Sequence, residues 1–273
     1  MPEGPELRCS TDFLTSYLQN EKLVDVAFTT GCRYKNKMPA GVNKLLKELA
    51  ELGPKVIVHT GCKGKFQWVE LEKEIYLHLT HGMTGFWSQN AVSHVSFILR
   101  LESLKELYFI DVRHFGTMKV VHTKAEHEKK LKSIGHDMLS NPCTLNEFKL
   151  LLQKNSSKTL AEFLMNQKHI SGVGNYVKAE ALYKAQLSPH HKCGLLTPSE
   201  AECLFVAIKE VLTLAYQLQG ASLRDYRTST GGKGNAASFF KVYKKKNDEL
   251  GNEIISEDTL DKRTTWWCPN IQV

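Results

Sequence analysis

The two residues that follow the initiator methionine combine a secondary amine with a carboxylate. Removal of Met1 would expose the nitrogen of Pro2 directly before Glu3. An α-amino group has a pKa of about 8, so part of it is unprotonated at neutral pH and is able to attack an aldehyde-level carbon, giving a Schiff base. Either the pair performs such chemistry, or Pro2 only starts a helix.

A glycine-rich junction between two helical patterns is a second candidate site. Residues 172–175 read Gly-Val-Gly-Asn, and a helical pattern continues from Tyr176. Two glycines permit a tight turn, after which the first N–H groups of the next helix and the Asn175 side chain are free to bind a phosphate. An ordinary turn between helices has the same pattern, so both interpretations stay open.

The C-terminal segment combines basic and aromatic residues in a strand-like pattern. Arg263 precedes Thr-Thr-Trp-Trp at 264–267, and the run 239–245 contains several lysines. We expect 239–245 and 263–268 to pair as a hairpin, with a mobile loop over 228–238 before it. A hairpin of this kind either lies along a nucleic-acid groove or only carries charge that protects a sheet edge.

Patterns of apolar residues along the rest of the chain predict the helices and strands that must position these residues. A helical pattern covers 5–19, and closely spaced β-rich runs lie between 23 and 121, with one short helix at 43–52. Such strands, without long helices between them, are typical of an antiparallel sandwich or barrel. Helical patterns dominate from 126 to 218, which places a domain boundary near 122–136.

Composition and charge indicate a folded protein with an anionic partner. Of the 273 residues, 42% are hydrophobic and 24% charged, and no run approaches the roughly 20 apolar residues of a membrane span. Lys and Arg outnumber Asp and Glu by 36 to 29, which favours nucleic acid as a partner. The N-terminus lacks a secretory pattern, so we expect the protein inside the cell. The seven cysteines are widely spaced, which argues against a disulfide framework and a zinc site.

Six short motifs occur in an order that matches one known family. They are Met-Pro-Glu-Gly-Pro-Glu-Leu at 1–7, Lys-Gly-Lys at 63–65, His-Gly-Met-Thr-Gly at 81–85, Asp-Val-Arg-His-Phe-Gly at 111–116, Gly-Val-Gly-Asn-Tyr at 172–176 and Lys-Arg-Thr-Thr-Trp-Trp at 262–267. Together they resemble the formamidopyrimidine-DNA glycosylase and endonuclease VIII (Nei) family of base-excision repair enzymes, over the whole chain. With glycine at position 4, the chain resembles the Nei branch of this family, whose members favour oxidised pyrimidines and hydantoins.

The resemblance implies an α+β multidomain fold. An N-terminal antiparallel β-sandwich with a leading helix would form the catalytic domain, over 1–125. A helical domain with a helix–two-turn–helix motif would bind DNA, over 126–235, and a β-hairpin finger would occupy 236–273. Many relatives have a four-cysteine zinc finger there, whereas this tail keeps only Cys268, with Asp248, Glu249 and Ile271 among the replacements. A single thiolate cannot close a tetrahedral zinc site, so the finger resembles the zincless subgroup.

The resemblance also implies a mechanism and roles for individual residues. Pro2 would attack C1′ of a flipped nucleotide while Glu3 protonates the sugar oxygen, and β,δ-elimination would then cut the strand. Glu6 would lie near the lesion, and the 228–238 loop would correspond to a base-contacting loop. Lys65, counted with the catalytic residues, would hold the DNA backbone together with Asn175 and Arg263. Met83, Arg113 and Phe115 would fill the space that the flipped nucleotide leaves, although Met83 could instead belong to the sandwich core.

Two other classes of function stay open at this point. One is a DNA-binding relative that has lost catalysis, and the intact Pro2–Glu3 pair with Lys65 argues against it. The other is a ribosomal or topoisomerase-like protein that shares only the helix–two-turn–helix element, which leaves the N-terminal motif unexplained. We expect damaged DNA as the partner, no cofactor, no metal, no membrane and a monomer, acting at DNA in the cell and in the nucleus if the source is eukaryotic.

Overall fold

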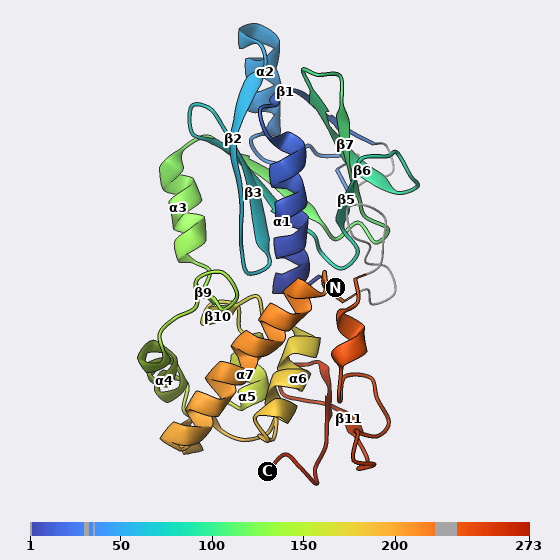
Figure 1. Cartoon of the computed structure of the whole chain (residues 1–273). Helices are drawn as coiled ribbons and strands as arrows, with labels where there is room; N and C mark the ends of the chain where they lie inside the picture. Colours follow the sequence, from blue (N-terminus) through green and yellow to red (C-terminus); the bar gives the residue numbers. More distant parts are fainter. Residues whose placement is uncertain (1, 30–32, 35, 222–233) are drawn as a thin grey trace. The chain divides into compact units, whose positions relative to one another are not determined.

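The computed structural model describes residues 2–29, 33–34, 36–221 and 234–273 (Figure 1). Within them the chain forms two compact units. The first, called the sandwich unit, contains Pro2, residues 6–133 and the described part of 219–235. The second, called the helical unit, contains residues 3–5, 134–218 and 236–273.

An eight-stranded antiparallel sheet builds the sandwich unit. Its strand order is β5-β7-β6-β1-β2-β3-β4-β8. β1 and β2 pair over only two residues, so the sheet consists of two halves that enclose one apolar core. The strands are β1 (Lys22–Phe28), β2 (Lys55–Lys63), β3 (Phe66–Leu71), β4 (Ile75–Thr80), β5 (Phe86–Ser88), β6 (Val95–Leu101), β7 (Glu106–Ile110) and β8 (Thr117–Val121). The predicted antiparallel sandwich is confirmed.

The leading helix, α1 (Gly4–Leu18), packs against both halves of this sheet (Figure 1). Leu14 and Leu18 are buried in the core, as their helical spacing predicts. Thr15 Oγ1 lies 2.7 Å from Thr60 Oγ1 on β2, and the Tyr17 hydroxyl donates to the Glu106 carbonyl on β7 at 3.1 Å. A second helix, α2 (Val42–Leu52), contributes Val42, Leu45 and Leu49 to the core. The C-terminal half of α1 is therefore fixed to the sheet.

The last helix of the sandwich unit, α3 (Lys124–Lys132), is attached by one buried side chain, His127. Its imidazole stacks on Tyr76 with ring centroids 4.1 Å apart, and its Nδ1 lies 3.0 Å from Nε2 of His78. The Lys63 ammonium donates to the Leu131 carbonyl at 2.9 Å, at the end of the helix. Burial lowers the pKa of His78 to about 4 and also lowers the pKa of His127, so this pair is neutral at pH 7.

We expect mild acid to destabilise the sandwich unit through this pair. The pKa of His78 is about 4 in the folded state and about 6.5 in the unfolded chain. The unfolded state therefore binds more protons below pH 6.5, and stability is lost as the pH falls through this window. The expected loss between pH 7 and pH 5 is about 2 kcal/mol in the free energy of unfolding, measured with urea. Replacing His78 by asparagine should flatten this dependence, whereas His59→Asn, at an exposed position on β2, should not.

Four helices and a short parallel strand pair form most of the helical unit. The strands β9 (His136–Asp137) and β10 (Ile170–Ser171) pair in parallel, with β10 directly before the glycine-rich junction. The helices are α4 (Leu145–Lys154), α5 (Leu160–Met165), α6 (Asn175–Lys184) and α7 (Pro198–Gln217), with a 3₁₀ turn at Cys193–Leu195. The start of α7 has the sequence pattern of a helix N-terminus, because Thr197 and Glu200 form a capping box with Pro198 in the first turn.

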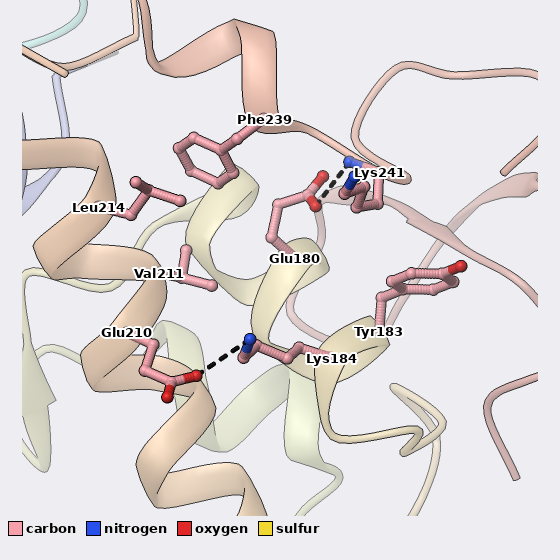
Figure 2. A pocket seen from close by; sticks show the side chains of 8 residues that line it. All are labelled: Glu180, Tyr183, Lys184, Glu210, Val211, Leu214, Phe239 and Lys241. Carbon is pink, nitrogen blue, oxygen red and sulfur yellow. Dashed lines mark hydrogen bonds and ion pairs between the residues drawn. The ribbon is translucent and has the colours of Figure 1, made fainter. Parts of the chain in front are cut away.

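The predicted pairing of 239–245 with 263–268 is wrong. The hairpin is formed by β11 (Ile255–Asp258) and β12 (Thr264–Trp267). Ala236–Phe239 is a 3₁₀ turn, and the buried Glu180 carboxylate of α6 accepts the N–H groups of Lys241, Val242 and Tyr243 at 2.8–3.1 Å. Figure 2 shows Glu180 directed at Lys241. Because these N–H groups are used in this way, 241–243 cannot form a strand ladder.

Asp248 organises the chain between this turn and the hairpin. Its carboxylate accepts the N–H groups of Leu250 and Asn252 at 2.9 and 2.8 Å and the Tyr183 hydroxyl of α6 at 3.0 Å. The buried Cys268 thiol lies 3.9 Å from Asp248 Oδ2. These contacts connect Asp248 to α6 and to Cys268, the residue that follows β12. In the part of the chain that the structure describes, no group of three or more His, Cys, Asp or Glu side chains is placed to hold a metal.

Candidate functional site

The Glu3 carboxylate is bound at the start of α6 in the helical unit. Glu3 is 3% exposed, and its two oxygens accept the N–H groups of Tyr176 and Val177 at 3.1 and 3.4 Å. The N-terminus of a helix favours negative charge, so α6 stabilises the ionised carboxylate. These are two of the N–H groups that the sequence suggested for a phosphate. In the structure they position the acidic half of the N-terminal motif instead.

Glycines on both sides allow this close approach. A Cβ at Gly174 would lie 2.0 Å from Cδ of Glu3, and a Cβ at Gly4 would lie 2.9 Å from Cα of Gly172. The Gly4 N–H donates to the Gly172 carbonyl at 2.8 Å, and Gly172 has a φ of 90°, which favours glycine. The sequence suggested a tight turn here but not that the glycines make room for Glu3.

Asn175 and the strand that follows Arg263 meet in the same unit. The Asn175 side-chain amide donates to the Thr264 carbonyl at 2.8 Å, so the first residue of α6 contacts β12. Arg263 directly precedes β12 and is exposed. The start of α6 therefore positions the Glu3 carboxylate, the Asn175 side chain and the backbone next to Arg263.

The other two predicted residues of the N-terminal motif, Pro2 and Glu6, belong to the sandwich unit, as does Lys65. Pro2 is buried, and Lys65 is partly exposed in the turn between β2 and β3, after Gly64 with a φ of 57°. Glu6 is 1% exposed and accepts the Ala221 N–H at 2.6 Å. Ala221 immediately precedes residues 222–233, so 228–233 of the predicted 228–238 loop lie outside the described residues, as does Met1.

Met83, Arg113 and Phe115 lie on two loops of the sandwich unit that touch each other. Met83 is in the turn between β4 and β5 and is only partly buried, outside the core cluster. Arg113 and Phe115 are exposed between β7 and β8, with the guanidinium carbon 5.1 Å from the Phe115 ring centroid. A Cβ at Gly82 would lie 2.9 Å from Cβ of Phe115, which shows how closely the loops approach. The structure thus brings all three side chains to one edge of the sandwich.

A buried aspartate connects these two loops. Asp111 is 1% exposed and accepts the Thr84 hydroxyl from the first loop and the Gly116 and Arg113 N–H groups from its own loop, the latter two at 2.6 and 3.3 Å. Sequence reasoning assigned no role to Asp111. Asp111 directly follows a strand and begins a short loop. An aspartate at such a position often accepts hydrogen bonds from the N–H groups of its own loop, and this pattern could have indicated its role.

A second buried hydrogen-bond network anchors the turn between β4 and β5, which carries Met83. Gln67 is fully buried on β3, and its Oε1 accepts the indole N–H of Trp87 at 2.9 Å. The two ring nitrogens of His81 lie 2.9 Å from Gln67 Oε1 and 3.1 Å from the Gly85 carbonyl. Gln67 also donates to the Thr11 hydroxyl of α1 at 2.9 Å. The turn that carries Met83 is therefore anchored to the sheet and, through it, to the leading helix.

Comparison with known proteins covers almost the whole chain. Residues 1–118 match the formamidopyrimidine-DNA glycosylase N-terminal domain, residues 134–227 its H2TH domain and residues 234–273 its C-terminal domain. The formamidopyrimidine-DNA glycosylase of Nitrobacter winogradskyi is 32% identical, over 84% of this chain and 80% of the relative. That of Afipia carboxidovorans is 29% identical over the full length of both.

Solved structures give the same result. The MutM (Fpg) protein of Thermus thermophilus superposes with a TM-score of 0.85 at 30% identity, over 99% of this chain and 98% of that one. Wild-type Lactococcus lactis Fpg in complex with DNA that contains an oxidised pyrimidine superposes with a TM-score of 0.85 at 25% identity, over 99% of both. Among the described residues, no helix is long and apolar enough to cross a membrane. From its sequence and its fold, the chain belongs to the formamidopyrimidine-DNA glycosylase family of base-excision repair enzymes.

Proposed function

We propose that this protein removes oxidised bases from DNA through a Schiff base at Pro2. As a member of its family it is a bifunctional DNA glycosylase and abasic-site lyase that acts on damaged DNA. The observation that carries the proposal is the position of Glu3, whose carboxylate is buried and held by two N–H groups of α6, one residue after Pro2. A carboxylate fixed beside an N-terminal amine suits acid–base assistance to that amine.

In the proposed reaction, the Pro2 nitrogen attacks C1′ of the damaged nucleotide. The base departs, and Glu3, which begins as the carboxylate, takes the proton that the Pro2 nitrogen loses. Glu3 then donates this proton to the ring oxygen as the sugar opens, which leaves an iminium ion between Pro2 and C1′. The iminium ion withdraws electrons and acidifies the C2′ proton, so the 3′ phosphate and then the 5′ phosphate leave. Hydrolysis of the remaining Schiff base returns the free amine.

Backbone phosphates need cationic and N–H donors on both sides of a flipped nucleotide. We assign this role to Lys65, Asn175 and Arg263. Arg263 is exposed. The Asn175 side chain donates a hydrogen bond to Thr264, the first residue of the strand that follows Arg263. Lys65 is partly exposed in a tight turn at the end of β2. Residues 1–125 would form the catalytic domain and residues 126–235 the helix–two-turn–helix domain that binds DNA.

Met83, Arg113 and Phe115 are proposed to enter the duplex. Removing a nucleotide from the stack costs a few kcal/mol, and apolar wedges offset part of this cost. Met83 and Phe115 would contact the neighbouring bases, and Arg113 would hydrogen-bond the base left without its partner. The contact of the Arg113 guanidinium with the Phe115 ring supports a joint role, because it orders both exposed side chains in advance.

The substrate class and the finger type are proposed from particular residues. Gly4 resembles the branch that prefers oxidised pyrimidines and hydantoins, and the buried Glu6 would line the lesion pocket. The finger would hold its hairpin without zinc, because Asp248 joins Cys268 to Tyr183 through hydrogen bonds. Elemental analysis of the purified protein for zinc tests this last point.

Borohydride trapping tests the mechanism. The wild-type protein should form a covalent adduct with an abasic site and with thymine glycol, located at Pro2 by mass spectrometry. Glu3→Gln should still react with the abasic site but should release thymine glycol at least about 100-fold more slowly, because general acid catalysis contributes about 10²–10⁴-fold. Glu126→Gln, an exposed glutamate at the start of α3, serves as the control. The absence of any adduct from protein whose mass confirms removal of Met1 would leave a DNA-binding protein without catalysis.

A further inference from the structure

An ion pair in the helical unit is almost completely shielded from water. The side chain of Lys178 on α6 is 0% exposed and that of Asp261 is 3% exposed, with Nζ 2.7 Å from Oδ2. Lys178 also donates to the Thr265 hydroxyl of β12 at 2.7 Å. Burial lowers the pKa of Lys178, whereas Asp261 raises it. The ammonium is therefore held between the turn of the hairpin and its second strand.

Asp261 lies in the five-residue turn Thr259 to Arg263 that connects β11 to β12. The Thr259 N–H donates to the Arg263 carbonyl at 3.1 Å, and the Lys262 N–H donates to the Thr259 carbonyl at 2.8 Å. The Thr259 hydroxyl lies 2.7 Å from that of Thr265 and donates to Asp261. The turn is thus closed on itself, and Lys178 fixes it to α6.

α6 contacts hairpin residues that lie on both sides of Arg263 in the chain. Asn175 binds the carbonyl of Thr264, one residue after Arg263, and Lys178 binds Asp261, two residues before it. Asn175 and Lys178 are three residues apart, so they lie on one face of the helix. The base of Arg263 is therefore fixed on both sides by one rigid element.

The Lys178–Asp261 ion pair has a structural effect beyond any contribution to the free energy of folding. A buried ion pair often stabilises a fold no better than apolar residues of the same size, because both charges lose their hydration. What it does provide is a specific geometry. The two hydrogen-bond partners of Lys178, Asp261 and Thr265, lie two residues before and two residues after Arg263 in the chain.

We propose that Lys178, through Asp261, is a positioning residue that holds Arg263 at the distance from Asn175 that a DNA phosphate requires. The inference rests on the proposed function, in which Asn175 and Arg263 bind the backbone. Lys178 itself does not touch DNA in this scheme. Its loss should weaken DNA binding and leave the chemical steps almost unchanged.

The experiment compares binding and chemistry in the full-length protein. Affinity is measured against salt concentration with a duplex that contains a tetrahydrofuran abasic analogue, which has no aldehyde for Pro2 to attack. The single-turnover rate is measured with saturating protein on a duplex that contains thymine glycol. We expect Lys178→Met to weaken binding by about tenfold and to reduce the salt slope by about one, since one phosphate contact is lost. The single-turnover rate should stay within about threefold.

Lys55→Met is the matched control. Lys55 is 1% exposed and paired with Glu48, and both residues belong to the sandwich unit. Its substitution should lower the melting temperature without changing the salt slope. Should Lys178→Met fail to unfold cooperatively, Asp261→Asn removes the charge with little change of shape and should give the same loss of binding.

A double-mutant cycle separates this inference from the proposed function. If Lys178 acts through Arg263, adding Lys178→Met to Arg263→Ala should cost no further affinity. Additive losses would overturn the inference, as would an unchanged salt slope in Lys178→Met when Arg263→Ala does weaken binding. If Arg263→Ala itself leaves affinity unchanged, the proposed phosphate contact fails instead.

Discussion

Replacing Gly174 by alanine is expected to slow base release by at least about 100-fold, the loss expected when general acid catalysis is removed. The new Cβ would lie 2.0 Å from Cδ of Glu3 and within 2.4 Å of both of its carboxylate oxygens. Gly174 has a φ of −130°, which alanine adopts without strain, so the effect comes from this collision alone. Glu3 must leave the N–H groups of Tyr176 and Val177, and the acid then loses its fixed position.

The measurement is single-turnover release of thymine glycol, compared with cleavage of a preformed abasic site. Gly174→Ala should resemble Glu3→Gln, and the double variant should be no slower than either single one, because both remove the same function. Gly194→Ala is the control, since its Cβ would lie 2.6 Å from Cβ of Ser156 elsewhere in the helical unit. It should lower stability but not base release. Normal base release by Gly174→Ala would mean that the bound position of Glu3 is not the catalytic one.

Elements with a local pattern could be predicted from the sequence. The leading helix follows from the spacing of Leu7, Leu14 and Leu18, all at most 1% exposed. The start of α7 follows from Thr197 and Glu200, which lie within one helical turn. In both cases the residues that determine the element are its own neighbours, so no distant contact could overrule them.

The finger shows why other parts could not be predicted. Residues 239–245 have a strand-like composition, yet Glu180, about 60 positions earlier in the chain, accepts three of their N–H groups. Nothing in the local pattern indicates such a distant acceptor. The true partner of β12 is Ile255–Asp258, whose sequence Ile-Ser-Glu-Asp contains only one apolar residue and therefore gives no clear strand pattern.

The candidate site was predicted residue by residue, but not the contacts that support it. Asp111 contacts Thr84, and Gly174 makes room for Glu3, but each pair joins two motifs that are distant in the sequence. Lys178 resembles any helical lysine in the sequence, although its neighbours Val177 and Ala179 are also buried. Such supporting residues depend on tertiary packing, which one sequence does not reveal.

Asp111→Asn is expected to reduce activity on duplex DNA much more than activity on single strands. Asp111 uses Oδ2 for the Gly116 N–H and Oδ1 for Thr84 and Arg113. Asparagine has only one acceptor oxygen, so its amide group would face a donor in a site that is 1% exposed. An unsatisfied buried donor costs about 1–3 kcal/mol. The loops that carry Met83 and Phe115 should therefore separate.

If these loops carry the wedge as proposed, we expect the loss of this arrangement to affect mainly the step that opens the duplex. A single strand has no opposite base and little stacking to replace, so the wedge side chains contribute little to its reaction. We expect the ratio of single-turnover rates, duplex over single strand, to fall about tenfold, since about 1.4 kcal/mol of lost wedge stabilisation corresponds to that factor. Asp25→Asn, which breaks an exposed ion pair with Arg100 in the same unit, should leave the ratio unchanged. Equal losses on both substrates would show that Asp111 maintains the fold of the sandwich unit and has no particular effect on the wedge.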